Sequence, residues 1–262
     1  MPPAERESNA VHRPRVGIPW RTTEEERAGK REKLDYYFAA VKKAGAEPVE
    51  ISLEQSPAQL DKQLDDLDAF VLPGSPADVD PSRYNEARHS KTKELDVNRD
   101  GTDDRILSHA FRSSKPVLAI CYGCQILNVH LKGTLVQDIP AERPTPIAHG
   151  QTDLPVGARK GDAEHQTVLL PDSKLAALSQ EAVPLINSSH HQAIDKPGQN
   201  LRVTAQSTDG IVEGVEWTGD SNWVVGVQWH PERMIGDSFS ERLFSDFVAA
   251  ASKARTAVAQ KS

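Results

Sequence analysis

The chain has very few cysteines: among its 262 residues only Cys121 and Cys124 occur, three positions apart. This count excludes a disulfide framework. Long apolar runs are also missing, because no segment approaches the about 20 consecutive apolar residues that a transmembrane helix needs. The polar residues 1–14 contain no apolar stretch of the kind found in secretory signals. These absences favour a cytoplasmic protein.

Positive charge is not in excess either, since 31 Lys and Arg residues face 38 Asp and Glu residues and the net charge is -7. Such a chain has no general attraction to nucleic acid or to an anionic membrane, so we predict neither as a partner. No internal repeat, low-complexity tract or linker divides the sequence. We therefore expect one domain over residues 15–251, between a disordered tail at 1–14 and a loose tail at 252–262.

Apolar strands and amphipathic helices alternate in the first half of the chain. Strands are expected at 15–20, 47–51, 68–72 and 116–120, and helices at 33–43, 56–67 and 102–111. This alternation predicts an α/β fold with an open, mostly parallel sheet flanked by helices. Short strand-like runs at 166–170, 201–206, 211–217 and 223–228 predict an antiparallel extension in the C-terminal half, closed by a helix at 239–251.

The most informative segment is the apolar strand 117–120, which runs directly into Cys121 and then, past Gly123, into a helical pattern. Catalytic groups in open α/β sheets lie at the carboxyl ends of the strands. A sharp strand-to-helix turn there lifts the side chain out of the sheet, and a glycine tolerates the close packing. The start of the helix favours thiolate over thiol, and the Tyr122 N–H would point to a developing oxyanion.

Three other interpretations of Cys121 remain open at this stage. A cysteine after an apolar strand is commonly a small buried hydrophobic residue. The pair Cys121 and Cys124 also has the spacing of a thioredoxin-like redox site. A zinc half-site is weaker, because no second cysteine pair exists in the sequence.

A second apolar strand, 223–228, is followed by His230-Pro231-Glu232. The proline ends the strand and fixes a turn. A carboxylate two residues after a histidine can reach one imidazole nitrogen and leave the other free to take a proton from a thiol. This is the logic of a nucleophile, a base and an orienting acid. Without Cys121, a capping histidine beside a surface glutamate would be the better interpretation.

The two segments together resemble a known family. The runs 121–125 and 226–232 are similar to the nucleophile and His-x-Glu motifs of class I glutamine amidotransferase-like proteins, in the same order. The resemblance covers about residues 15–247 and implies a flavodoxin-like, three-layer fold. It also implies a hydrolase with the catalytic residues Cys121, His230 and Glu232.

Two further segments narrow the resemblance. The run 187–193, Asn-Ser-Ser-His-His-Gln-Ala, and the pattern from Asp209 to Glu213 resemble signatures of the γ-glutamyl-γ-aminobutyrate hydrolase family. The loop 72–81 looks like the one that supplies a second oxyanion-hole amide, so the resemblance implies an oxyanion hole formed by Gly74 and Tyr122. It also implies a set of substrate-binding residues, namely Gln125, Ser189, His190, His191 and Gln192.

The function implied is release of glutamate from a small γ-glutamyl substrate through a thioester, without a cofactor or a metal, by a chain that forms a monomer or a homodimer. The alternative is a glutaminase subunit that supplies ammonia to a separate synthetase. Two departures from the family pattern leave the substrate open. Gly74-Ser75-Pro76 stands where the family often has a run of glycines, and Tyr122 stands where arginine is common.

One segment resembles a calcium loop. Residues 96–101 match the first half of an EF-hand pattern, but Leu107 stands where the bidentate glutamate belongs. We therefore predict no calcium site. Asp100 is expected to cap a helix that begins at Thr102.

Overall fold

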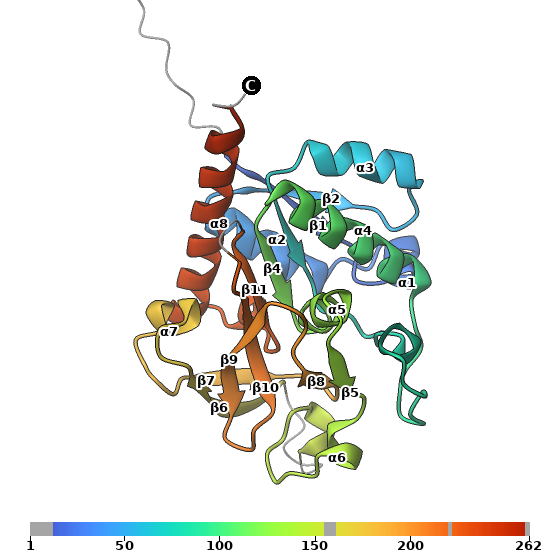
Figure 1. The fold of residues 1–262 in the computed structure, drawn as a ribbon, viewed down its shortest axis with the longest axis vertical. Helices are drawn as coiled ribbons and strands as arrows, with labels where there is room; N and C mark the ends of the chain where they lie inside the picture. The colour runs from blue at the N-terminus through green and yellow to red at the C-terminus, as the bar shows by residue number, and fades with distance from the viewer. Residues whose placement is uncertain (1–12, 155–160, 220–221, 260–262) are drawn as a thin grey trace, which may run out of the picture.

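The computed structural model describes residues 13–154, 161–219 and 222–259. Within these residues the centre of the fold is a sheet of eleven strands (Figure 1). The strands are β1 (Arg15–Pro19), β2 (Glu47–Ile51), β3 (Ala69–Leu72), β4 (Val117–Ile120), β5 (Thr134–Val136), β6 (Ala163–Leu169), β7 (Leu185–Ser188), β8 (Ala193–Lys196), β9 (Leu201–Ser207), β10 (Val212–Trp217) and β11 (Val224–Val227).

The strand order is β2-β1-β3-β4-β11-β10-β9-β6-β7. The first five strands of this order run parallel to their neighbours. Every pairing from β11 onward is antiparallel, and β5 and β8 form a side pair attached to β10. This arrangement confirms the predicted α/β fold with a parallel core and an antiparallel extension.

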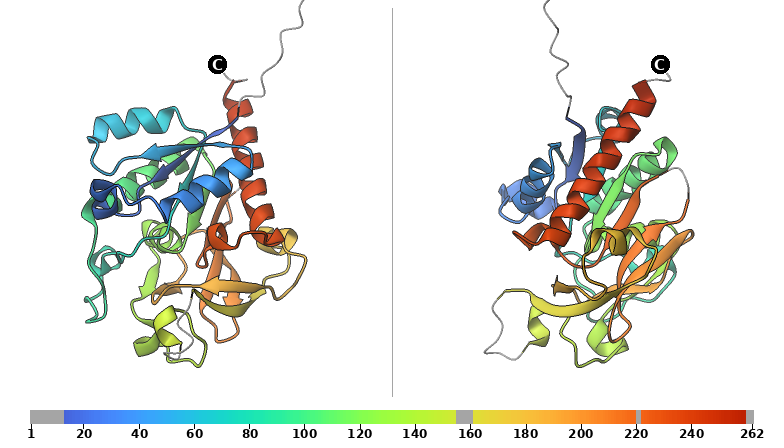
Figure 2. Two further views of the ribbon diagram at one scale, coloured as in Figure 1. Left: turned by 180° about the vertical axis from the view of Figure 1, so that it is seen from behind. Right: turned by 90° about the vertical axis from the view of Figure 1, so that its left-hand side faces the viewer.

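Helices cover both faces of the parallel core (Figures 1 and 2). They are α1 (Thr23–Ala28), α2 (Leu34–Lys43), α3 (Pro57–Asp65), α4 (Val97–Ser113), α5 (Tyr122–His130), α6 (Ile139–Glu142), α7 (Lys174–Leu178) and α8 (Ser238–Ala259). Apolar side chains of α2 and α8 pack on one face, and those of α3, α4 and α5 pack on the other. The layers are therefore helix, sheet and helix.

Strand β4 shows how the sequence builds these layers. Leu118 and Ile120 belong to the hydrophobic cluster beneath α2 and α8, and Val117 and Ala119 belong to the opposite cluster. All four side chains are fully buried. A parallel strand buried on both faces reads as a continuous apolar run, which explains why this strand could be predicted.

Two helix boundaries differ from the prediction. Helix α4 begins at Val97, because Asp96 caps it by accepting the Arg99 N–H at 3.0 Å. Asp100 lies inside the helix and pairs with Arg83, so the segment that resembles a calcium loop is helical. Helix α8 continues through Ala259, which makes the expected loose tail wrong for residues 252–259.

The end of α8 is held by tertiary contacts, since Arg255 donates to Asp68 at 3.0 Å across the edge of the sheet. The predicted tails at 1–12 and 260–262 lie outside the described residues, and the single-domain assignment stays a prediction. Among the described residues, no helix is both long and apolar enough to cross a membrane.

Gly123 lies in the first turn of α5, where the helix approaches strand β3 closely. A Cβ at this position would lie 2.2 Å from the Leu72 backbone oxygen at the end of β3. We expect Gly123→Ala to lower the free energy of unfolding by about 1–3 kcal/mol, because backbone must move to admit the methyl group. Urea denaturation measures the change.

Gly101 in α4 gives a matched control, since nothing lies within 4 Å of a Cβ placed there. Gly101→Ala should leave stability unchanged or raise it by about 0.5–1 kcal/mol, as alanine favours a helix. Equal stability of the two variants would contradict the close packing of Gly123 on β3.

Candidate active site

Cys121 occupies a strained turn between β4 and α5. Its backbone has φ 54° and ψ -108°, a conformation that costs a non-glycine residue about 1–3 kcal/mol. The turn is held on both sides: the Cys121 N–H donates to the Val227 oxygen at 2.8 Å, and the Cys121 oxygen accepts the Gln125 N–H at 3.1 Å. The predicted strand-to-helix turn is therefore present, with the cysteine at the carboxyl end of a parallel strand.

His230 and Glu232 follow β11 and form a buried pair. His230 Nδ1 lies 2.7 Å from Glu232 Oε1. The backbone of His230 is fixed by Asn187, which accepts its N–H at 2.9 Å and donates to its oxygen at 3.0 Å. Because Nδ1 faces the carboxylate, the other imidazole nitrogen, Nε2, is left for chemistry.

The sheet brings this pair to the cysteine. Strands β4 and β11 are parallel neighbours with Ile120 opposite Val227, so the segments that follow them lie side by side. Gly74 marks where they converge: a Cβ on it would lie 2.7 Å from His230 Cε1 and 3.4 Å from the Cys121 Cβ. The structure thus assembles Gly74, Cys121 and His230 at one point.

The charges at this point shift the pKa of His230. Burial lowers it, but the negative charge of Glu232, that of Cys121 and hydrogen bonds to both raise the pKa to about 9. Burial conversely raises the pKa of Glu232, and the His230 charge more than compensates, so this pKa ends below its ordinary value. The site therefore favours an imidazolium beside a carboxylate.

Both backbone polar groups of Gly74, its N–H and its oxygen, form hydrogen bonds. Its N–H donates to the Tyr37 hydroxyl at 3.0 Å, and its oxygen accepts from Arg21 Nε at 3.0 Å. The Tyr37 oxygen also lies 3.4 Å from His230 Nδ1. Burial raises the Tyr37 pKa, so the hydroxyl stays neutral. An oxyanion can take the Gly74 N–H only by displacing this hydroxyl. The sequence does not indicate this contact, because Tyr37 lies in the predicted helix 33–43, far from Gly74 along the chain.

A buried arginine supports the loop that carries Gly74. The Arg99 guanidinium is fully buried, pairs with Asp103 at 2.8 Å and lies over the Tyr122 ring with 4.9 Å to its centroid. It donates to three backbone oxygens, those of Pro73, Arg21 and Trp20, at 2.6, 2.9 and 3.2 Å. One cation therefore connects α4, the β1 and β3 loops and the residue that follows the cysteine.

The predicted substrate-binding residues lie in two places. Gln125 is buried in α5, and its Nε2 donates to the Gln192 oxygen at 3.1 Å and to Gln228 Oε1 at 3.2 Å. Ser189 is half-buried in the turn between β7 and β8. The amide of Gln192 donates to the Gln137 oxygen at 3.2 Å, while its buried Oε1 has no hydrogen-bond partner among the described residues.

The β7–β8 turn is joined to the loop of Gly74 through His191. Its Nε2 lies 3.0 Å from Asp78 Oδ1 and its Nδ1 lies 3.2 Å from Asp138 Oδ1. His190 points elsewhere, toward Glu213. Gln125 connects this turn to the cysteine, because its side chain donates to the Gln192 oxygen and its N–H donates to the Cys121 oxygen. The His190 imidazole belongs to a separate buried cluster.

The Cys124 side chain is packed in the protein interior. It is fully buried against β11, where its Sγ lies 2.8 Å from the position of a Cβ on Gly226. Burial strongly raises the pKa of its thiol. Both features favour a packing role over a redox partner for Cys121.

A large surface hollow, of about 1420 Å³, lies elsewhere. Its lining includes Arg15, Asp68, Pro116 and Trp223, which begin or precede strands β1, β3, β4 and β11. It therefore lies at the amino ends of the parallel strands, whereas Cys121 follows a carboxyl end. Position relative to the sheet, and not hollow size, identifies the candidate site.

Comparison with known proteins identifies the family of the chain. The family Peptidase C26 matches residues 14–232, so the chain belongs to this class I glutamine amidotransferase-like family and is a hydrolase. It is 34% identical to Protein NtpR of Enterococcus hirae over 80% of this chain and 85% of that protein. It is 33% identical to the γ-glutamyl-γ-aminobutyrate hydrolase PuuD of Escherichia coli, over 82% and 84% of the two chains.

A solved structure shows the same fold. The glutaminase domain of Trypanosoma brucei CTPS, with bound acivicin, superposes with a TM-score of 0.60 at 14% identity, covering 91% of this chain and 94% of that one. At this identity the likeness concerns the fold alone.

The ionisation of His230 can be tested directly. NMR titration of the imidazole should give a pKa near the 9 expected for the native site. Glu232→Gln should lower this pKa toward the ordinary value of about 6.5, because the charge that stabilises the imidazolium is gone.

Glu241→Gln is the matched control, since Glu241 is an exposed residue of α8 that pairs with Lys43. It should leave the His230 pKa unchanged. A His230 pKa that stays the same in Glu232→Gln would show that the carboxylate does not set the charge of the imidazole.

Proposed function

We propose that the protein is a cysteine hydrolase that cleaves the γ-glutamyl amide bond of a small γ-glutamyl compound, γ-glutamyl-γ-aminobutyrate or a related amine. The observation that carries the proposal is the convergence of Cys121, on its strained turn, with the buried His230–Glu232 pair. The relative named γ-glutamyl-γ-aminobutyrate hydrolase in Escherichia coli supports the choice of substrate class.

In the proposed reaction, His230 already holds the thiol proton as an imidazolium, and the Cys121 thiolate attacks the γ-carbonyl carbon. The tetrahedral intermediate collapses, the C–N bond breaks, and the imidazolium of His230 gives its proton to the leaving amine. Water then attacks the thioester, with His230 as base, and glutamate leaves as the thiolate is restored. Glu232 holds the imidazole by Nδ1 and stabilises its positive charge.

The oxyanion would be stabilised by two backbone amides. Tyr122 is the first residue of α5, and the first N–H groups of a helix have no partner within it. Gly74 supplies the second N–H when the oxyanion displaces the Tyr37 hydroxyl that accepts from it. Each well-placed donor contributes about 3–4 kcal/mol to the transition state.

The α-amino and α-carboxylate groups of the glutamyl moiety require polar partners. Gln125, Ser189, His191 and Gln192 are the proposed set, and the buried, unpaired Oε1 of Gln192 is the acceptor best suited to an ammonium group. His190 would support the same turn from behind. A homodimer is part of the proposal, and so is action without an added cofactor.

The proposal predicts that the purified protein releases glutamate from at least one γ-glutamyl amide. The panel consists of γ-glutamyl-γ-aminobutyrate, other γ-glutamyl amines, γ-glutamyl peptides and glutamine. Cys121→Ala should lose about 10⁴- to 10⁶-fold in kcat, because it removes the nucleophile. Circular dichroism and thermal unfolding confirm that the variant is folded.

Cys124→Ala provides the matched control. The packed cysteine takes no part in the proposed chemistry, so the variant should keep its activity, whereas a Cys121–Cys124 redox site would lose it. Slow turnover of glutamine alone would favour the glutaminase subunit of a two-chain amidotransferase. Absence of release from every amide by folded wild-type protein would contradict the proposed hydrolase.

A further inference from the structure

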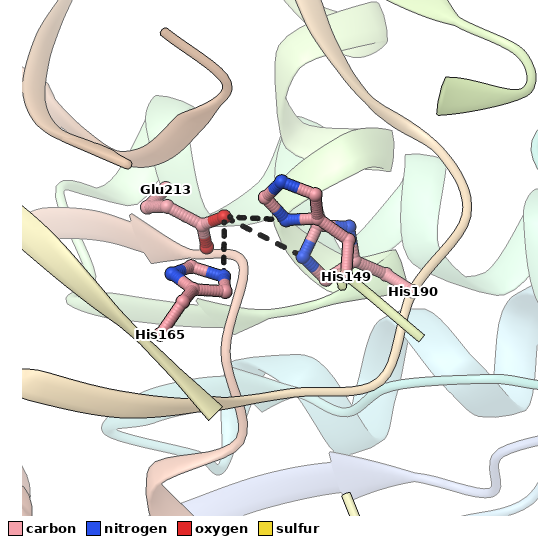
Figure 3. Close-up of side chains that lie close together, drawn as sticks. All are labelled: His149, His165, His190 and Glu213. Carbon is pink, nitrogen blue, oxygen red and sulfur yellow. Dashed lines mark ion pairs between the residues drawn. The ribbon is translucent and has the colours of Figure 1, made fainter. Parts of the chain in front are cut away.

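Behind the β7–β8 turn, three imidazoles and one carboxylate face a common centre (Figure 3). Glu213 Oε1 lies 3.4 Å from His149 Nδ1, 3.4 Å from His165 Nε2 and 3.6 Å from His190 Nε2. All four side chains are buried, and their candidate ligand atoms lie within 4.8 Å of one another. We call these residues the His149–Glu213 cluster.

The inward atoms of this cluster are not satisfied by hydrogen bonds. The distances exceed the 2.7–3.2 Å typical of N–H···O bonds, and none of the three nitrogens nor either Glu213 oxygen has a hydrogen-bond partner among the described residues. Buried polar groups are normally paired, so several unpaired atoms aimed at one point require an explanation.

The outward nitrogens show which way the imidazoles are protonated. His149 Nε2 lies 2.9 Å from Asp209 Oδ2, His190 Nδ1 lies 2.9 Å from the Gln192 oxygen, and His165 Nδ1 lies 3.3 Å from the Gln166 oxygen. Carbonyl and carboxylate oxygens only accept, so each ring donates its outward N–H. A neutral ring then presents a lone pair inward, which is the arrangement of metal-bound histidines and their supporting acceptors.

We propose that the His149–Glu213 cluster binds one divalent transition-metal ion, of which zinc fits best. Metal–ligand bonds of about 2.0–2.1 Å in a tetrahedron place the ligands about 3.3–3.4 Å apart. The observed separations from Glu213 Oε1 are 3.4, 3.4 and 3.6 Å. The other separations in the cluster lie within 4.8 Å, and the wider ones would shorten when the ion binds. Nitrogen and oxygen ligands suit zinc, and a centre closed by four side chains is typical of a structural zinc site.

The ligands come from four separate segments: the loop after α6, strand β6, the β7–β8 turn and strand β10. The metal would therefore fasten the antiparallel part of the sheet to the β7–β8 turn. Two backbone oxygens connect the cluster to the candidate active site. The Gln192 oxygen accepts from both His190 and Gln125, and the Glu213 oxygen accepts the Gln228 N–H two residues before His230.

The test is metal analysis of full-length protein purified without a metal-affinity step. Plasma mass spectrometry should find about one zinc per chain, as expected for a closed four-ligand site. His165→Gln and Glu213→Gln should lower metal affinity by at least about 10- to 100-fold, because changing residues that only hydrogen-bond to the ligands of a metal already costs this much. His109→Gln, which alters another buried histidine, should keep the metal.

Thermal unfolding of wild-type protein keeps the proposal testable if the variants fail to fold. Removal of the ion by a chelator should lower the Tm, and zinc at about 100-fold above its Kd should restore about 5–10 °C. Cobalt in its place should give the intense visible absorption of a four-coordinate ion.

Cys121→Ala should retain the metal, so this test is independent of the proposed hydrolysis. Wild-type protein that contains no metal and shows the same Tm with chelator as with added zinc would overturn the proposal. The cluster would then be a network that shares protons.

Discussion

The active-site arrangement depends on one sharp turn of the backbone, at Cys121. Its φ of 54° is unfavourable for a residue with a side chain, and neighbouring contacts must hold it. The hydrogen bond to Val227 fixes the turn to β11, and the close approach of Gly123 to Leu72 fixes it to β3. The same contacts therefore hold the strained cysteine and place it between the two loops that bear Gly74 and His230. Packing on both neighbouring strands maintains the geometry that the proposed chemistry needs.

The His230–Glu232 pair adds an electrostatic constraint to this packing. A folded-state pKa of about 9 exceeds the ordinary 6.5, so protonated His230 favours the folded state. That contribution is fully present below about pH 6.5 and is lost as the pH rises through about 9. The lowered pKa of Glu232 acts in the opposite direction, and its contribution is lost as the pH falls through the folded-state value. Both contributions are full between about pH 4.5 and 6.5, so the pair stabilises the fold most in that range. Asn187 keeps the His230 backbone in place.

Features that arise from contiguous residues were predictable from the sequence. The apolar run 117–120 predicts a buried strand, and the residues after it predict the turn at Cys121. Segment 223–232 likewise predicts a strand followed by the turn that carries His230 and Glu232. Features that arise from distant residues were not. Nothing near Tyr37 in the sequence indicates that its hydroxyl meets the Gly74 N–H, and the ligands of the His149–Glu213 cluster span four segments. The start of α4 was misplaced because Asp96, and not Asp100, caps the helix, while Asp100 pairs with Arg83, which lies outside the helix.

The parallel and antiparallel parts of the sheet are held in place by different interactions. The parallel strands are buried on both faces, so hydrophobic packing holds them in place. Hydrogen bonds from Arg99 to Pro73 and from Cys121 to Val227 then fix the loops at their ends. The β7–β8 turn stands between strands that bury few apolar side chains, namely Ile186 in β7 and Ala193 and Ile194 in β8. Polar contacts must therefore hold this turn, and they do so at both ends: His191 reaches Asp78, and His190 reaches the cluster around Glu213. A metal ion at that cluster would give the substrate side of the site a rigidity that its short strands cannot supply by packing.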